Sequence, residues 1–459
     1  MYNTANIDME ATSLGLRDSR AVAWVLATLV MLVALVWPAL WNGFPLIFYD
    51  TGGYIMRMFE RELGFGRSAI YGAFLWPGIP LEFWPCILAQ AALIAWLVTL
   101  TLRAHGFGGR PGLAAAVVVA LCAITGLPWF TAQLMPDIFL PAAVLGLYLL
   151  SFQLPALRAW EQLALAAVVA FAIASHMSTL GVALGLFVAL ALLRPFATHI
   201  GLPRPALLAP ASAVMLGLLL APVSNFLIGG RFAFTPGGAN FAFVRLIDDG
   251  ILKRFLAEHC PDPTLRICAV RDEIPDSGNH WLWSDDPLRS KLGGPLEFED
   301  EARRIVLRTL ILYPGAHLRS VLRGTANQLF LVRTMDHFTS DTWHTTWVIE
   351  NYALPAYASY LLSRQHQDTL GSRWLDAVYV PVALVAFLAL PIIVILGWVG
   401  RVPPSAAALA LVAFLALVGN AMICGTLSTP ADRYQSRLAP LATLSVMLAA
   451  LGWRRRMPE

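Results

Sequence analysis

The sequence predicts an all-α polytopic membrane protein with about ten transmembrane helices and a mixed, largely helical domain on the outer side. Hydrophobic residues make up 58% of the 459 residues and charged residues only 13%, and the mean hydropathy is +0.65. A soluble globular chain of this length is much less apolar and more charged. The apolar residues also fall into long runs, as membrane-spanning helices require.

Runs of about 17 to 25 apolar residues, the length that crosses a bilayer as an α-helix, define the predicted spans. The first run is too long for the core of a signal peptide, and no small-x-small cleavage site follows it, so we expect it to be retained. The fifth and sixth runs are nearly contiguous. The spans are Ala21–Trp41, Glu82–Leu102, Gly112–Leu127, Asp137–Phe152, Trp160–His176, Met177–Leu193, Pro205–Ile228, Trp374–Val399, Pro404–Leu427 and Arg437–Trp453.

Arginine and lysine in short connections concentrate on the cytoplasmic side of a membrane protein. If the N-terminus is inside, eleven arginines lie on the inner side and five in short outer loops. Both termini are therefore predicted to be cytoplasmic, in the inner or plasma membrane of the cell. The inner set is Arg17, Arg20, Arg103, Arg110, Arg158, Arg194, Arg204, Arg401, Arg454, Arg455 and Arg456, and the outer set is Arg57, Arg61, Arg67, Arg433 and Arg437.

This orientation divides the chain into three parts. Residues 1–228 form an N-terminal transmembrane core, whose first outer loop is 42–81. Residues 229–373 form an outer, periplasmic domain after the seventh span, and 374–459 supply the last transmembrane helices.

The outer segment is too charged to enter lipid, with seventeen Asp and Glu residues. Glu299–Leu312 and Gly315–Arg333 are predicted to be helices, whereas 229–298 shows no pattern that predicts a fold. The second helix has one apolar face, which either lies on the membrane surface or packs against the rest of the domain. Cys260 and Cys268 lie in an oxidising compartment, where they could form a small-loop disulfide or remain two thiols.

Ionisable side chains are absent from the middle of every predicted span. Ion-coupled transporters place such residues near the bilayer midplane, so the sequence argues against that class. The chain has only two lysines, Lys253 and Lys291, and no basic tract, so no nucleic-acid partner is expected. Acids and a histidine at the outer ends of spans instead favour a site on the outer membrane surface, where a membrane-held substrate meets a polar one.

Asp50 is the first candidate site residue, because it lies just beyond the first span. A carboxylate beside a bilayer is a good proton acceptor once a partner holds it ionised. Gly52 and Gly53 would form a tight turn and let a ligand approach the backbone closely. Alternatively, Asp50 caps a short helix that begins near Thr51.

Three further outer segments supply candidates, each with a structural alternative. Asp137 opens the fourth span, where an acid also favours a helix start. His176 joins the fifth and sixth spans and could be an ordinary turn residue. Arg433 and Tyr434 precede the tenth span and could be interface anchors.

Together these segments resemble the GT-C superfamily of polytopic membrane glycosyltransferases, which take a sugar from a polyprenyl-phosphate carrier. The resemblance covers the layout of spans and the first 180 residues, and the outer domain matches no family pattern. The first loop lacks the paired-acid motif of the superfamily, so the resemblance leaves open whether the transfer depends on a metal ion. The matching features are Phe48-Tyr-Asp-Thr-Gly-Gly-Tyr54 with Gly66-Arg-Ser-Ala-Ile-Tyr71, Met135-Pro-Asp137, and Asp432-Arg-Tyr434 before a span with Pro440.

The resemblance implies an inverting transfer, in which an acceptor hydroxyl attacks the anomeric carbon and polyprenyl phosphate leaves. Asp50 would take the proton, and Asp137 would position the acceptor or share the base role. Arg433 would neutralise the phosphate through its bidentate fork, with Arg67 as the rival. A divalent cation on the phosphate is a weaker alternative, because the loop offers one clear acid. The other implied contacts are Tyr434 for the donor phosphate and Tyr49, Tyr54, Tyr71 and His176 for substrates.

Two other classes stay open. A lipid or polysaccharide transporter would need a polar path along the spans or at the edge of the protein. A noncatalytic envelope assembly protein would need only the outer domain and its tryptophans as a binding face. For the transferase, the expected partners are the lipid bilayer, a polyprenyl-phosphate sugar donor and a glycan, lipid or protein acceptor.

Overall fold

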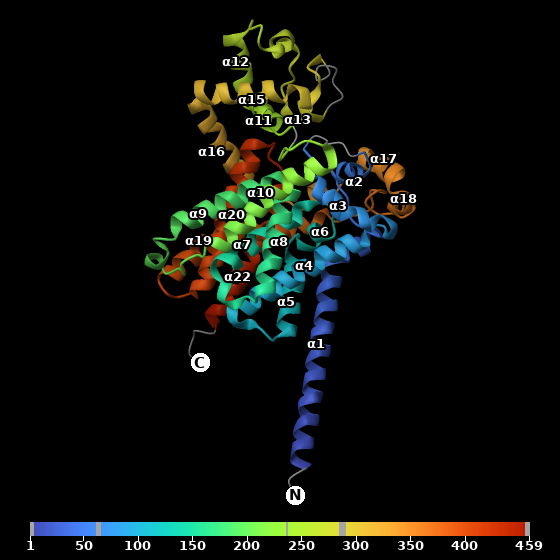
Figure 1. Ribbon diagram of the computed structural model, residues 1–459, viewed down its shortest axis with the longest axis vertical. Coiled ribbons are helices and arrows are strands. Elements are labelled where there is room, and N and C mark those ends of the chain that lie inside the picture. Colours follow the sequence, from blue (N-terminus) through green and yellow to red (C-terminus); the bar gives the residue numbers. More distant parts are fainter. Residues whose placement is uncertain (1–3, 61–65, 236, 284–290, 455–459) are drawn as a thin grey trace.

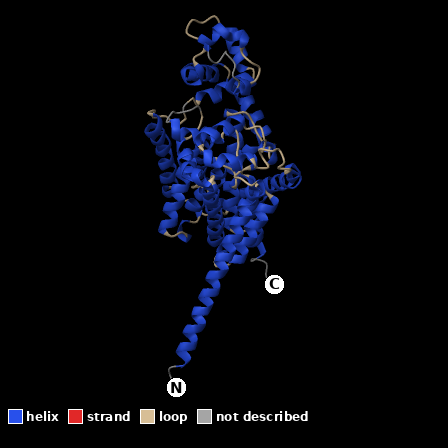
Figure 2. Cartoon of the chain, turned by 90° about the vertical axis from the view of Figure 1, so that its right-hand side faces the viewer, coloured by secondary structure: helices blue, strands red, loops and turns tan. Residues whose placement is uncertain are grey.

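The computed structural model describes residues 4–60, 66–235, 237–283 and 291–454. The structure is 78% helix, and no strand occurs among these residues. Helices of different lengths form one bundle with a smaller group of helices beyond it (Figures 1 and 2). The all-α fold predicted from the apolar runs is therefore confirmed.

Each of the ten predicted spans coincides with an α-helix. Among the described residues, six helices are long and apolar enough to cross a membrane, as a membrane-embedded protein requires. These are α1, α4, α10, α19, α20 and α22, whereas α5, α7, α8 and α9 are shorter. The bounds are α1 Thr4–Asn42, α4 Trp84–Leu102, α5 Pro111–Ile124, α7 Phe139–Phe152, α8 Ala159–Ser175, α9 Met177–Leu193, α10 Leu208–Gly229, α19 Asp376–Trp398, α20 Pro404–Leu427 and α22 Ala439–Arg454.

Helix α7 forms the centre of the bundle. All of its side chains are buried, and it packs against α4, α8, α9, α10, α20 and α22. A helix that is apolar on every side is surrounded by protein. Because its neighbours separate it from lipid, α7 need not match the thickness of the bilayer, which accounts for its 14 residues.

A smaller group of helices, the head, lies beyond one end of the bundle, opposite the first and last described residues (Figure 1). We call that end the head side and the other the terminus side. The head has its own apolar core, which includes Phe243, Phe255 and Phe298. Cys260 and Cys268 form a disulfide within it, with Cα atoms 5.6 Å apart. Its elements are α11 Ala239–Asp248, α12 Ile251–His259, η6 Arg266–Glu273, α13 Gly278–Trp283 and α15 Gly294–Leu312.

The rest of the predicted outer segment packs on the bundle and not on the head. Helix α17 lies against α2, and α18 lies against η1. The buried residues Met335, Val348 and Tyr360 belong to the same apolar core as the bundle. The segment from 229 to 373 is thus divided between two cores. The elements concerned are α2 Thr51–Glu60, η1 Trp76–Leu81, η7 Met335–His337, α17 Trp343–Tyr352, α18 Leu354–Leu361 and η8 Arg373–Leu375.

Helix α16, Pro314–Phe330, connects the head to the bundle and packs along α20. Its start after Tyr313 agrees with the helix break predicted there. The two helices cross at Gly324 and Gly425, where a Cβ on either glycine would meet the other's backbone. The face of α16 that packs on α20 carries the buried residues Gly324 and Gln328. Leu318, Leu322 and Phe330 of this helix remain exposed.

The Gly324–Gly425 crossing makes a stability prediction. Gly425→Ala is expected to destabilise the fold by about 1–3 kcal/mol, because the new methyl group forces the two backbones apart. Gly419→Ala is the matched control, since a Cβ at that position of the same helix meets nothing within 4 Å. Thermal unfolding in detergent compares them, and equal melting temperatures would contradict the close crossing.

Exposed tryptophans occur at both ends of the bundle. Trp374 precedes α19 and Trp398 ends it, and the helix between them rises about 35 Å. This length matches a hydrocarbon core of about 30 Å with its interfaces. Tryptophan rings prefer those interfaces, so the two levels indicate where a bilayer would lie. Apart from Trp283 in the head, the exposed rings are Trp41, Trp76, Trp343, Trp347 and Trp374 on the head side and Trp160, Trp398 and Trp453 on the terminus side.

Candidate active site at the head side of the bundle

Backbone pairing brings together the two loops that carry the predicted acids. Leu46 donates its N–H to the Ala132 carbonyl at 3.0 Å, and Leu134 donates to the Leu46 carbonyl at 2.8 Å. This is the parallel bridge between Leu46 and Gln133. The loop after α1 therefore lies beside the loop before α7.

Two buried glutamines fix this pairing from either side. Gln365 accepts the Ile47 N–H at 3.1 Å and donates to the Ile47 carbonyl at 3.0 Å. Gln90 donates to the carbonyls of Thr131 and Gln133 at 2.8 and 3.0 Å. The loops are held as rigid parts of the core, which gives any side chain they carry a defined position.

Asp50 lies between two arginines. Its Oδ1 accepts a hydrogen bond from Arg67, and its Oδ2 accepts one from Nη2 of Arg433 at 3.3 Å. Helix α2 does begin at Thr51, as the capping alternative expected, but both carboxylate oxygens are engaged by guanidinium groups. The Asp50 side chain is 18% exposed, so this cluster is within reach from the head side.

Gly52 and Gly53, which follow Asp50 closely, are approached by other residues of the same chain. Gly52 donates its N–H to Oγ1 of Thr345 at 3.0 Å, and a Cβ on Gly52 would come within 2.9 Å of the Thr345 Cα. A Cβ on Gly53 would come within 3.2 Å of the Arg67 side chain. The close approach predicted here for a ligand is thus made by α17 and by Arg67.

Arg433 opens the short helix α21, Arg433–Ser436, and is almost fully buried. Its guanidinium lies over Phe48 at 4.0 Å from the ring centroid and 5.2 Å from that of Tyr434. Among the described residues its Nη1 has no hydrogen-bond partner. A buried guanidinium with a free donor is suited to bind an anion bidentately.

A second ion pair lies deeper in the bundle, between Asp137 and Arg437. The Asp137 Oδ1 accepts from the Arg437 Nη1 at 3.0 Å, and both side chains are at most 1% exposed. Arg437 also donates to Ser178 and Asn420, each at 3.0 Å. Within the described chain, Oδ2 of Asp137 and Nε of Arg437 remain unpaired. Arg437 was not among the residues predicted for the site, although its spacing of four residues from Arg433 places both on one helical face.

His176 is a turn residue between two helices, as the structural alternative predicted, and it also contacts the candidate site. The backbone is extended there (φ −150°, ψ 128°), so α8 ends and α9 begins. Nδ1 of His176 lies 2.8 Å from Oγ of Ser178. Because Ser178 contacts Arg437 in turn, His176 belongs to the network around the buried pair.

His337 is a site residue that the sequence did not mark. It lies in η7, stacked on Phe130 with ring centroids 5.4 Å apart, and neither ring nitrogen has a partner among the described residues. Burial, with a smaller contribution from Arg433, lowers the pKa of His337 to about 3. The imidazole is therefore neutral and offers both a donor and an acceptor.

The predicted tyrosines occupy different environments. Tyr54 is buried near the two arginines that hold Asp50, and burial raises the pKa of its hydroxyl, which stays protonated. Tyr71 packs edge-on against Tyr54 and donates to Gln90 at 3.1 Å, which orients the loops. Tyr49 is 40% exposed. The Tyr434 ring lies beneath both Arg433 and Arg437.

The acids of the site do not form a metal-binding set. Asp50 and Asp137 are each engaged by arginine. In the described part of the chain, no group of three or more His, Cys, Asp or Glu side chains is arranged to hold a metal ion. The residues present thus do not fit the divalent cation considered above, and arginines supply the positive charge.

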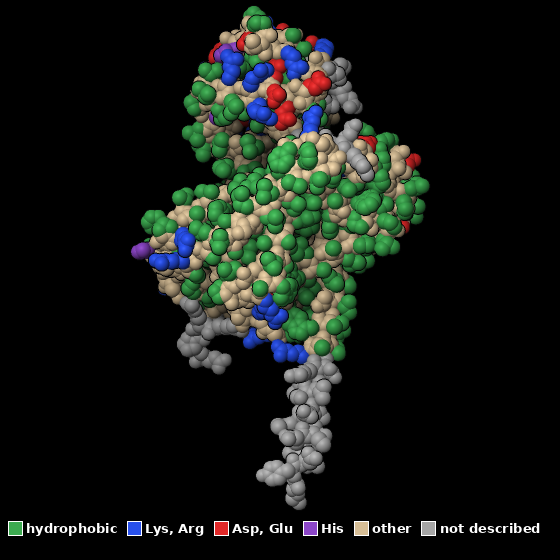
Figure 3. All heavy atoms as spheres, in the orientation of Figure 1, with side chains coloured by type: hydrophobic (Ala, Val, Ile, Leu, Met, Phe, Trp, Pro, Cys, Tyr) green, Lys and Arg blue, Asp and Glu red, His purple; other side chains and the backbone are tan. Residues whose placement is uncertain are grey.

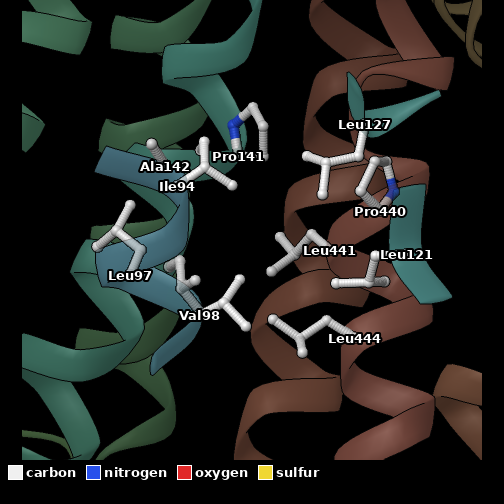
Figure 4. A pocket seen from close by; sticks show the side chains of 11 residues that line it. Ile94, Leu97, Val98, Leu121, Leu127, Pro141, Ala142, Pro440, Leu441 and Leu444 are labelled. Carbon is white, nitrogen blue, oxygen red and sulfur yellow. The ribbon is translucent and has the colours of Figure 1, made fainter. Parts of the chain in front are cut away.

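An apolar crevice, lined in part by Pro141 and Pro440 (Figure 4), lies close along the chain to the buried ion pair of Asp137 and Arg437. Pro141 lies four residues after Asp137 and Pro440 three after Arg437, so both face the crevice from beneath that pair. In Figure 4 the side chains from α4 lie on the same side of the crevice as Pro141 of α7, and Pro440 and Leu441 lie on the opposite side. All lining side chains are apolar: Ile94, Leu97, Val98, Leu121, Leu127, Pro141, Ala142, Leu145, Pro440, Leu441 and Leu444.

No protein-family model, curated protein or solved structure matches the chain.

Proposed function

We propose that the chain is a membrane glycosyltransferase that moves a sugar from a polyprenyl-phosphate donor to an acceptor at the head-side face. The observation that carries this proposal is one cluster with free arginine donors and carboxylates, at the level of the head-side tryptophans and above an apolar crevice. A phosphate, a sugar and a lipid tail are the three chemical parts of such a donor, and the cluster offers a partner for each.

Arg433 and Arg67 would bind the donor phosphate. In the structure both contact Asp50, which acts as a stand-in anion for the guanidinium groups. A phosphate offers more acceptor oxygens and a bidentate match to each arginine. Its arrival would draw both arginines away from Asp50 and leave the carboxylate able to accept a proton.

Asp50 would then accept the proton of the acceptor hydroxyl as its oxygen attacks the anomeric carbon. The bond between that carbon and the phosphate oxygen breaks, and polyprenyl phosphate leaves with its electron pair, so the sugar configuration inverts. The free Oδ2 of Asp137 would orient the acceptor, and the Tyr49, Tyr54 and His176 side chains would contact the substrates. Tyr434 would hold the two arginines beneath the phosphate.

The lipid tail would enter the bundle at the apolar crevice, which has a volume of about 30 Å³, so α4 and α22 would have to move apart to admit the chain. A prenyl chain contributes hydrophobic free energy of roughly 0.8 kcal/mol for each buried CH₂ group. Leu441→Phe is expected to narrow the crevice and weaken use of long-chain donors, while short-chain donors are less affected. The measurement is the ratio of kcat/KM for long and short prenyl phosphates, and an unchanged ratio would place the tail elsewhere.

The proposed topology has ten spans, with the head outside and both termini in the cytoplasm. At the terminus side of the bundle Figure 3 shows Lys and Arg side chains without acids beside them, whereas the head shows both basic and acidic side chains. Arg271→Cys in the head should react with an impermeant maleimide in intact cells, and Arg194→Cys only after permeabilisation. The native free cysteines are buried and serve as the background. The reverse pattern would overturn the orientation.

Transfer of label distinguishes the three classes. Liposomes would contain purified protein and a polyprenyl-phosphate hexose labelled in the sugar, with envelope glycan added outside. A transferase moves label from the lipid-soluble fraction into the glycan. A transporter moves intact labelled lipid between leaflets, and an assembly protein does neither. Either of the last two results would reject the proposed function.

Arg433→Lys separates charge from geometry at the phosphate. The lysine keeps the positive charge but loses the planar fork, so KM for the donor is expected to rise about tenfold. Folding should change little, which thermal unfolding can check. If Arg433→Ala leaves donor binding unchanged while Arg67→Ala abolishes it, the phosphate belongs at the first loop. Arg319→Ala, on the outer part of α16, is the control.

A further inference from the structure

A second cavity lies at the terminus side of the bundle, at the end opposite the candidate active site. It has a volume of about 290 Å³. Its walls come from α1, α4, α5 and the π-helical turn η2, Arg103–Phe107. They carry the apolar side chains Trp24, Leu102, Phe107 and Ala114 together with Thr99, Arg103 and Arg110.

Three arginines lie at the opening of this cavity, and they differ in whether an acid pairs with them. Arg103 is held by two hydrogen bonds to Glu161, at 2.7 and 2.5 Å, so its charge is neutralised and its stem forms a wall beside Gly108. Arg110 is exposed at the start of α5. Arg20 reaches from α1 to Gly109, where a side chain would collide with it. Neither Arg20 nor Arg110 forms a salt bridge with a described residue.

The surroundings of these two cations favour an anion that has a lipid tail. The N-terminal end of α5 adds the positive end of a helix dipole and unpaired backbone N–H groups. Next to Trp24, one face of α1 is apolar and exposed. It follows the helix from the cavity to the level of the middle of the bundle and carries Val22, Val25, Leu26, Leu29 and Val33. Glu161, which holds Arg103 in the cavity wall, directly follows Trp160, so the cavity lies near a tryptophan of the terminus side, where lipid headgroups are found.

We propose that this cavity binds the phosphate headgroup of an anionic phospholipid in the terminus-side leaflet. Arg20 and Arg110 contact the phosphate oxygens, and the acyl chains follow α1. A zwitterionic lipid presents its own cation to the two arginines and binds more weakly. This site is independent of the proposed sugar transfer, because it lies at the other end of the bundle.

Native mass spectrometry of the full-length protein with added lipids tests the proposal. Wild type should retain phosphatidylglycerol in preference to phosphatidylcholine and melt at a higher temperature when it is present. Replacing both arginines, Arg20→Gln with Arg110→Gln, should weaken retention about thirtyfold, at roughly fivefold for each charge near a membrane surface. Arg401→Gln, another exposed arginine on the same side, is the matched control.

Each other outcome overturns the proposal. Equal retention of both lipids by wild type, or unchanged retention by the double variant, would reject an arginine-lined site. An equal melting shift with inorganic phosphate would assign the cavity to a free phosphate and reject the lipid. Should the double variant unfold, Arg110→Gln alone decides: it should weaken retention roughly fivefold, and retention equal to wild type would again contradict the assignment.

Discussion

Replacing Asp50 by asparagine is expected to slow sugar transfer about a hundredfold to ten-thousandfold, the usual cost of removing a general base. The amide has nearly the same shape and can still accept hydrogen bonds from Arg67 and Arg433 through its oxygen, but it cannot take a proton. Insertion and melting temperature should therefore stay close to those of wild type. The measurement is kcat of purified protein with a saturating donor, set beside thermal unfolding.

Glu60→Gln is the matched control for that experiment, since Glu60 ends the same helix and bonds the Tyr352 hydroxyl at 2.6 Å, a bond that glutamine can keep. Its transfer rate should be normal. If the Asp50→Asn protein raises only KM for the donor, Asp50 positions the arginines and is not the base. Near-normal transfer would move the base role to Asp137.

Asp137→Ala is expected to destabilise the fold by about 3–5 kcal/mol, because it leaves the fully buried Arg437 without its counter-charge. Ser178 and Asn420 still accept hydrogen bonds from Arg437, but neither supplies a negative charge. Thermal and denaturant unfolding in detergent measure the loss. Transfer should fail as well, since the free oxygen of Asp137 is lost from the site.

Two comparisons isolate the charge effect of Asp137. Asp341→Ala removes an exposed acid and should change stability by less than about 0.5 kcal/mol. Asp137→Ala combined with Arg437→Leu replaces the pair by apolar groups, which is often neutral. The double variant should therefore recover much of the stability. An Asp137→Ala protein as stable as the Asp341→Ala protein would contradict a buried, charge-dependent pair.

The helices were predictable because a helix that crosses lipid needs a run of about 17 to 25 apolar residues, which is visible in the sequence. Each apolar run became a helix, and the turn between the fifth and sixth runs falls at His176, between α8 and α9. This length rule also predicted a span at Asp137–Phe152, but it did not predict that every side chain of α7 is buried by protein. Periodicity reports apolar character, and it cannot tell whether protein or lipid will cover a face.

The candidate site was predictable in part. Asp50, Asp137, His176 and Arg433 were selected because one orientation places them on one face, and the structure brings them into one network. Arg437 and His337 were missed. Their positions depend on contacts across long sequence separations, such as the 300 residues between Asp137 and Arg437. The prediction assigned η7 and α17 to a separate outer domain, whereas both pack on the bundle and reach the site.

A structure determined with a polyprenyl phosphate in a lipid nanodisc tests the central claim most directly. We predict phosphate density within hydrogen-bond distance of Arg433 and Arg67, with both guanidinium groups moved away from Asp50. Density for the prenyl chain should continue past Pro440 into the apolar crevice. Phosphate density at any other place, or no binding at a saturating concentration, would contradict the proposal that this cluster is the donor site.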